Sequence, residues 1–105
     1  MISQTERKRF RAIGHHLKPI VTVASKGVTD SVIQEIDRAL RDHELIKIKV
    51  SAERDERKVV IQTLLETTKA ELVQQIGATA LLYRPAEEPD PGLSNLLRSL
   101  QDARR

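Results

Sequence analysis

Two short strand-like segments, separated by one amphipathic helical segment, constrain the fold of this chain most strongly. Residues 19–24 (PIVTVA) are continuously apolar and β-branched, which is typical of a strand buried on both faces or paired in a parallel sheet. Residues 45–52 (LIKIKVSA) alternate instead, and this pattern predicts a half-buried strand. Between them, residues 30–42 carry an apolar stripe at helical spacing, and Thr29 is a suitable N-cap. This order favours a parallel pair joined by a right-handed crossover.

The alternation within the second strand separates two kinds of side chain. Ile46, Ile48 and Val50 face one way, whereas Lys47 and Lys49 face the other. The second face therefore carries two positive charges. Whether this lysine face lies beside the first helix and the loop after the first strand depends on which side of the sheet the helices cover.

The first helix is predicted over residues 5–17, with an apolar stripe at helical spacing. Ser3 together with Glu6, or Thr5 alone, can cap its start. Gly14 weakens this helix and can end it early, because glycine has a high conformational entropy in the unfolded chain.

A third helix is expected near residues 55–68, with Asp55 as its N-cap. Residues 71–77 and 79–84 then resemble a hairpin, and glycine first in the two-residue turn 77–78 suits type II′ geometry. The resulting order is αβαβαββ. We expect a compact two-layer α/β domain, with helices packed on a four-stranded mixed sheet, since the hairpin adds an antiparallel strand.

The chain has 105 residues, which is the size of one domain. We expect the domain to span residues 1–85, because Pro85, Pro89 and Pro91 break regular structure there and mark a linker into the tail 86–105. Residues 93–100 (LSNLLRSL) predict a short amphipathic tail helix that docks on the domain or on a partner. No segment has the apolar length of a signal peptide or a membrane-spanning helix, so we expect a cytoplasmic protein.

The positive charge is concentrated at one end of the chain. The formal net charge is +3, but residues 1–27 hold six basic side chains and one acidic side chain, Glu6. Such asymmetry suggests a polyanionic partner, although a solvated basic helix face is an alternative explanation. Aromatic side chains that could stack on bases are limited to Phe10 and Tyr83. If the partner is a nucleic acid, recognition must rely mainly on its backbone. The six basic residues are Arg7, Lys8, Arg9, Arg11, Lys18 and Lys26.

The loop between the first strand and the second helix is a candidate anion site. Ser25 can donate a hydrogen bond, Lys26 supplies a full charge, and Gly27 permits a positive φ and a close approach of a ligand. Asp30, at the first helical position, works against anion binding there. A helix cap formed by Thr29 and followed by an acid is the structural alternative.

The residues that could support catalysis or metal binding form no recognisable constellation. His15 and His16 are adjacent and diverge by at least about 100°, and His43 lies near a predicted helix end. No HExxH, GxSxG or Walker motif is present, and there is no cysteine. We therefore expect neither an enzyme nor a cofactor. A metal-dependent hydrolase that uses these histidines is the alternative that bound metal would reveal.

Several blocks of the sequence, in order, resemble the CRM domain, and specifically its small single-domain bacterial members, the YhbY-like family. The blocks are residues 17–40 (LKPIVTVASKGVTDSVIQEIDRAL), 43–50 (HELIKIKV) and 76–85 (IGATALLYRP). The resemblance implies an α/β domain similar to the C-terminal domain of bacterial translation initiation factor 3. It also implies binding of RNA, without catalysis, in association with the precursor of the large ribosomal subunit.

The family's GxxG loop, which resembles the loop by which KH domains hold an RNA backbone, reads here from Ala24 to Gly27. The first glycine is replaced, which matters little if Ala24 ends the strand with a negative φ. We expect a monomer that binds RNA and neither a membrane nor a small substrate. The alternative function is a protein-interaction module that docks through the Leu93–Leu100 stripe. The predicted RNA-binding residues are Ser25, Lys26, Gly27, Arg7, Lys8, Arg11, Lys18, Lys47 and Lys49.

Overall fold

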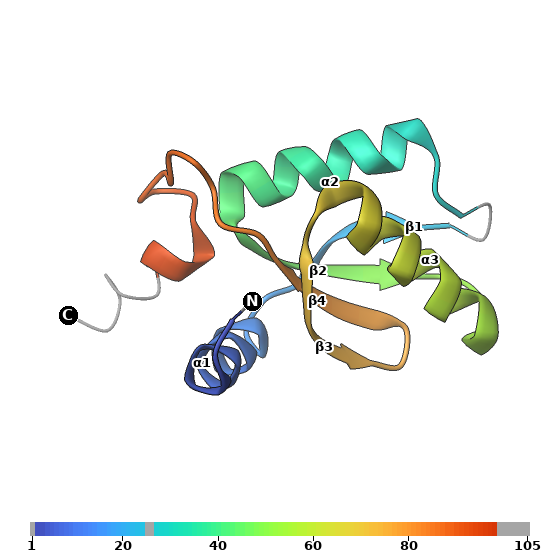
Figure 1. The fold of residues 1–105 in the computed structure, drawn as a ribbon, viewed down its shortest axis with the longest axis horizontal. Coiled ribbons are helices and arrows are strands. Elements are labelled where there is room, and N and C mark those ends of the chain that lie inside the picture. The colour runs from blue at the N-terminus through green and yellow to red at the C-terminus, as the bar shows by residue number, and fades with distance from the viewer. Residues whose placement is uncertain (1, 25–26, 99–105) are drawn as a thin grey trace.

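The computed structural model describes residues 2–24 and 27–98. The elements follow the predicted order αβαβαββ (Figure 1). They are α1 (Gln4–Gly14), β1 (Pro19–Val23), α2 (Asp30–His43), β2 (Leu45–Val50), α3 (Arg54–Thr68), β3 (Glu71–Ile76) and β4 (Thr79–Tyr83).

The four strands form one mixed sheet in the order β1-β2-β4-β3. β1 and β2, which α2 connects along the chain, pair in parallel. β4 pairs antiparallel with both β2 and β3. Gly77 opens the β3–β4 turn with φ 56°, and Ala78 is not among the described residues with positive φ. This backbone fits the predicted type II′ turn rather than type I′. The α/β class and the mixed sheet are thus confirmed.

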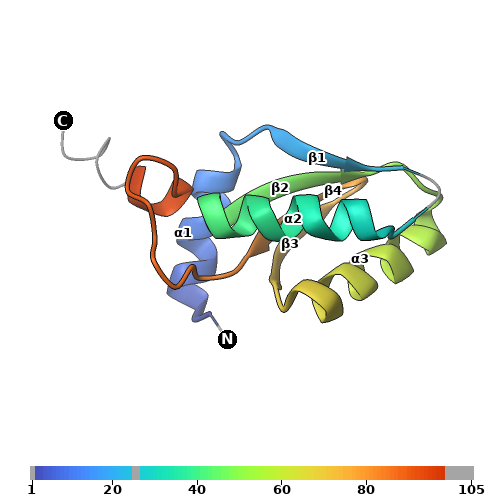
Figure 2. The ribbon, with the colours of Figure 1, turned by 90° about the horizontal axis from the view of Figure 1, so that it is seen from above.

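Alternate residues along the strands enter two separate cores. Ile46 and Ile48 of β2 pack with α2 and α3 in the larger core, whereas Leu45 packs with Phe10 of α1 and Leu81 of β4 in a smaller one. Because successive strand residues point to opposite faces, α1 must lie on the face opposite α2 and α3. Figures 1 and 2 show α1 near the N-terminal end of β2. The predicted two layers therefore gain a partial third layer.

At Gly14 the backbone of α1 lies directly against the sheet. A Cβ atom at this position would lie 2.5 Å from Cδ2 of Leu81, so the helix backbone rests directly on that side chain. The helix also ends here, three residues before the predicted end at residue 17. Its start was predicted correctly, because the Ser3 side chain and Glu6 form a capping box.

One of the two alternatives predicted for β1 and the predicted N-cap of α3 were wrong. β1 is an edge strand in which Val21 and Val23 are buried while Ile20 and Thr22 are exposed, so it is not buried on both faces. Its parallel pairing, the other alternative, is confirmed. The N-cap of α3 is Glu53 without a side-chain hydrogen bond, and the predicted cap Asp55 lies within the first turn. A carboxylate in that turn is still favoured by the helix dipole.

The segment after β4 folds back onto the domain. Leu96 is 8% exposed and belongs to the α1-side core. Ser94 and Glu44 are both buried, and the Ser94 hydroxyl donates to the Glu44 carboxylate at 2.7 Å. Figure 2 shows this red segment next to α1 and the C-terminal end of α2. The tail helix predicted over residues 93–100 is helical at 95–98, and Leu100 lies outside the described residues.

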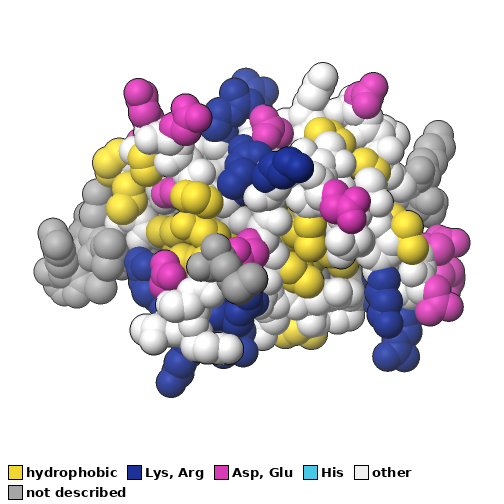
Figure 3. All heavy atoms as spheres, in the orientation of Figure 1, with side chains coloured by type: hydrophobic (Ala, Val, Ile, Leu, Met, Phe, Trp, Pro, Cys, Tyr) yellow, Lys and Arg dark blue, Asp and Glu magenta, His cyan; other side chains and the backbone are white. Residues whose placement is uncertain are grey.

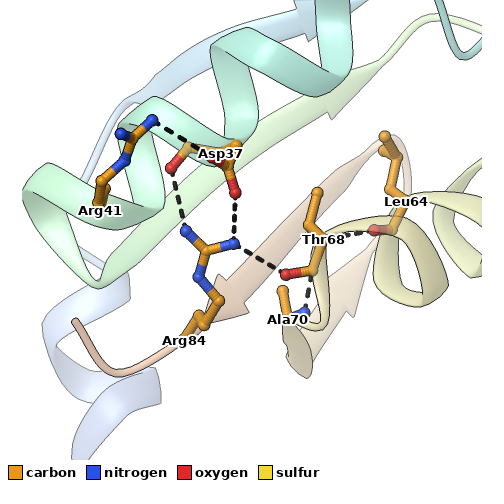
Figure 4. A network of polar contacts seen from close by, with 6 residues as sticks. All are labelled: Asp37, Arg41, Leu64, Thr68, Ala70 and Arg84. Atoms are coloured by element: carbon orange, nitrogen blue, oxygen red, sulfur yellow. Dashed lines mark hydrogen bonds and ion pairs between the residues drawn. The ribbon is translucent and has the colours of Figure 1, made fainter. Parts of the chain in front are cut away.

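Arg84, directly after β4, joins three elements (Figure 4). Its guanidinium donates to the Asp37 carboxylate at 2.6 Å and to the Asp37 carbonyl at 3.1 Å. The same group donates to the Thr68 carbonyl, at 2.8 Å, at the end of α3. Charge-assisted bonds of this kind are stronger than neutral ones, so Arg84 fixes the end of the sheet against both helices.

Candidate nucleic-acid interface

The loop after β1 has the backbone predicted for its glycine. Gly27 has φ 84°, and its N–H donates to the Ala24 carbonyl at 2.9 Å. A Cβ atom on Gly27 would meet no atom within 4 Å, so the backbone conformation and not crowding favours glycine. Thr29 caps α2 as expected by accepting from the Val32 N–H at 3.2 Å. Ser25 and Lys26 lie outside the described residues.

Ala24 follows the last residue of β1 and is not among the described residues with positive φ. The missing first glycine therefore does not force an alanine into the left-handed region. Ala24 is exposed, so its methyl group adds bulk at the surface only.

Lys47 and Lys49 point to the face that α1 covers only in part. Across the sheet, Lys49 is flanked by Thr22 of β1 and Thr79 of β4. We call this uncovered area the open face, and its described residues include no acidic side chain. They are Ile20, Thr22, Lys47, Lys49, Gln74, Ile76 and Thr79.

A basic stripe on α1 extends this surface. Lys8, Arg11 and His15 are exposed and lie three and four residues apart, which places them on one side of the helix. His15 and Lys47 line the same small depression at the end of α1, so the stripe meets the open face there. His15 was not a predicted site residue, although its spacing from Arg11 could have shown it.

Arg7 differs from the other basic residues of α1. Its guanidinium donates to the carbonyls of Leu72 and Val73 at 2.9 and 2.8 Å and forms an ion pair with Glu71 at 3.7 Å. The register of β3 shifts between Leu72 and Gln74, so Arg7 satisfies carbonyls at an irregular edge. Arg7 thus supports the fold, and its predicted contact with RNA stays a prediction.

The structure brings Lys8, Arg11, Lys47 and Lys49 to one side of the molecule. Lys18 precedes β1 and Gly27 follows it, so these two residues lie at opposite ends of that strand.

Comparison with known proteins identifies the family. The CRS1 / YhbY (CRM) domain matches residues 2–84. This chain belongs to the CRM family.

A CRM relative from Pseudomonas aeruginosa, named a probable RNA-binding protein, is 47% identical over 98 residues, which cover 92% of this chain and 94% of the relative. An RNA-binding protein of Haemophilus influenzae is 44% identical over 86 residues, with coverage of 80% and 87%. A Staphylococcus aureus protein, presented as a candidate RNA-binding protein in its solution structure, has a TM-score of 0.73 and 34% identity. That comparison covers 84% of this chain and 93% of the other, so the CRM fold is shared.

The opposite side of this CRM domain has a different charge. A cavity of about 740 Å³ beside the end of α2 has five acidic lining residues against Arg41 and Arg84, and both arginines contact Asp37. Figure 3 shows acidic and basic side chains interspersed on the surface that bears α2 and α3. A phosphate backbone would be repelled from such a cavity. The five acids are Asp37, Asp42, Glu87, Glu88 and Asp90.

The three histidines do not gather at one point, because His15 and His16 contact each other and His43 lies on another helix. His15 and His16 stand nearly perpendicular with ring centroids 5.4 Å apart, and His43 Nδ1 lies 2.9 Å from the Leu93 carbonyl. Within residues 2–24 and 27–98, no group of three or more potential metal-ligating side chains occurs. Among the helices of these described residues, none combines the length and the apolar character that crossing a membrane requires.

Proposed function

We propose that this protein binds structured RNA, mainly through the sugar–phosphate backbone, and that it does so without catalysing a reaction. The observation that carries the proposal is the open face, where Lys47 and Lys49 lie among aliphatic and hydroxyl side chains and continue onto the basic stripe of α1. The membership of this chain in the CRM family and the names of its relatives also support RNA as the partner.

The chemistry of the surface favours recognition of shape and charge. Each lysine or arginine that neutralises a phosphate releases condensed counterions, and this release drives association without sequence readout. Both aromatic rings, Phe10 and Tyr83, pack against each other beneath α1 with centroids 4.7 Å apart. They are therefore not available as stacking platforms for bases.

More specifically, we propose that the protein acts in the cytoplasm in assembly of the large ribosomal subunit, where it binds the precursor RNA of that subunit. It rests on the resemblance to the single-domain CRM proteins. Co-sedimentation with precursor particles in preference to mature subunits is the experiment that tests it.

The structure weakens the alternative of a protein-interaction module docking through Leu93–Leu100. Leu96, the centre of that stripe, is buried in the chain's own core. A partner would have to displace it from Phe10 and Leu45, at a cost of about 1.5–3 kcal/mol for exposing one large side chain.

The test of RNA binding is Lys26→Ala, with affinity for a ribosomal RNA transcript measured at several salt concentrations. If Lys26 neutralises a phosphate, affinity falls, and the slope of log affinity against log salt becomes shallower by about 0.7–0.9. Lys69→Ala is the matched control, because Lys69 lies beside Glu6 and Glu71 and away from the open face.

Two results would separate the proposed function from the role of Lys26. If the unaltered protein does not bind RNA, the function is wrong. If Lys26→Ala and Lys69→Ala have the same salt slope as the unaltered protein, Lys26 is not part of the interface.

A further inference from the structure

We propose that the C-terminal segment completes a second phosphate-binding site, in which Arg98 joins Lys18 and Lys47 to hold one phosphate of the RNA backbone. This inference rests on the proposed function and adds a residue from outside the matched CRM domain, which ends at residue 84. We call the site the cationic cleft.

The cationic cleft lies between the chain entering β1, the start of β2 and the tail. Lys18, Lys47 and Arg98 line it together with His43 and Asn95, and no acidic residue does. Its volume is about 180 Å³. That is below the roughly 300–1,000 Å³ of sites that enclose drug-sized ligands, and it suits a small anion such as a phosphate group.

The three cations have no counter-charge on the described part of the chain. Lys18 and Arg98 are exposed and form no ion pair or hydrogen bond through their side chains there, and neither does the half-buried Lys47. Like charges gathered around one cleft repel one another, so the site is electrostatically favourable for an anion that touches all three.

Buried contacts, and not chance packing, place Arg98 at the cleft. The Glu44 carboxylate accepts from the Ser94 hydroxyl at 2.7 Å and from the Ala86 N–H at 2.9 Å. Glu44 itself has φ 62° and ψ −45°, an unfavourable backbone for a non-glycine residue that persists only where the surroundings enforce it. Arg98 lies one helical turn after Ser94, and its N–H donates to the Ser94 carbonyl at 2.9 Å.

Two further bonds fix the same turn to the domain. The Asn95 side chain donates to the Leu45 carbonyl at 2.6 Å. His43 Nδ1 must donate to the Leu93 carbonyl, because a carbonyl oxygen can only accept. The segment that carries Arg98 is thus ordered before any ligand arrives, which reduces the entropy lost on binding.

The cationic cleft and the Gly27 loop can contact different phosphates of one RNA. They lie at opposite ends of β1, whose first and last residues are four steps of ~3.3 Å, or about 13 Å, apart. Sites separated by more than ~7–10 Å with no shared partners act almost independently. The effects of losing each site on binding free energy should therefore add.

The experiment compares Arg98→Gln with Arg38→Gln, an exposed arginine on α2 that does not line the cleft. Both changes remove one positive charge, so they lower the general attraction equally. Binding is measured to an RNA hairpin with a duplex stem and a single-stranded loop over a series of salt concentrations. We expect Arg98→Gln to reduce the salt slope by about 0.7–0.9, and Arg38→Gln to leave it unchanged.

A second variant tests the placement of Arg98. Ser94→Ala removes the hydroxyl that bonds to Glu44 and keeps the Arg98 charge, and we expect a loss of slope similar to that of Arg98→Gln. Equal slopes for Arg98→Gln and Arg38→Gln would overturn the inference even if Ser94→Ala fails to fold. Absence of RNA binding by the unaltered protein would instead refute the proposed function.

Discussion

The two faces of the sheet differ in what covers them, although the same four strands build both. The α2/α3 face is closed over by two helices, and its residues form the larger apolar core. The other face is covered only where α1 lies, and beyond it the open face presents lysines and two exposed aliphatic side chains, Ile20 and Ile76, which are 50% and 68% exposed. The α2/α3 face therefore supplies the larger share of the buried apolar contacts, and the open face stays exposed to solvent.

Neighbouring residues of β2 show the division most clearly. Ile48 is 0% exposed, and the next residue, Lys49, is exposed. A fully buried aliphatic side chain contributes about 1.5–3 kcal/mol through removal from water. A surface lysine contributes little to folding and acts at long range through its charge.

The largest effect is expected from Ile48→Ala, which should lower the free energy of unfolding by about 2–5 kcal/mol because it leaves a cavity beneath α2 and α3. The adjacent change, Lys49→Ala, should alter stability by less than about 0.5 kcal/mol and weaken RNA binding. Chemical denaturation of both variants, with RNA titrations of the folded protein, checks the pair. A strongly destabilised Lys49→Ala would show that the open face also contributes to the fold.

The features predicted correctly from the sequence are those whose causes lie close along the chain. Thr29 caps α2 through Val32, Gly27 adopts a positive φ within its own loop, and the alternation of β2 separates Ile48 from Lys49. Each of these depends on the residue itself or on neighbours within about one helical turn.

The features that could not be predicted depend on contacts distant in sequence. The apolar stripe of α1 could pack on either face of a sheet, and its side is set by contacts such as that between Arg7 and Leu72, 65 residues apart. The fit of Gly14 on Leu81 and the bond between Ser94 and Glu44 are of the same kind. Local pattern does not encode which distant surface a stripe will meet, so β1 was also expected to be more buried than it is.

The partial cover over the second face can be tested at Gly14. Gly14→Val introduces a branched side chain where a single Cβ would already lie 2.5 Å from Leu81, which is itself 3% exposed. Overpacking of this kind costs about 1–3 kcal/mol, so thermal or urea unfolding should show a clear loss of stability.

Ala12→Val is the control for that change, because Ala12 is an exposed position on the same helix. Its cost should be limited to helix propensity, roughly 0.5 kcal/mol. Equal losses in the two variants would mean that α1 does not rest on β4 through Gly14. A larger loss of stability in Gly14→Val would show that α1 packs tightly on Leu81 at this position.

The smallest expected effect on stability concerns Tyr83, which is partly buried at the edge of the smaller core. Burial raises the pKa of Tyr83 above its ordinary value near 10, and the negative charges of Glu44, Glu6 and Glu71 raise it further. Since this is the only tyrosine and there is no tryptophan, an ultraviolet absorbance titration reports on it alone. We expect a higher midpoint in the folded protein than in urea.

Because the pKa of Tyr83 is higher in the folded state, the free energy of unfolding depends on pH in the alkaline range. The folded state holds the phenolic proton more tightly than the unfolded state, so the contribution of Tyr83 is complete below about pH 10 and is lost as pH rises through the folded pKa. Above that pH the free energy of unfolding should fall more steeply for the unaltered protein than for Tyr83→Phe, which has no proton to lose. Parallel pH profiles for the two proteins would show that the smaller core admits water as freely as the open face beside it.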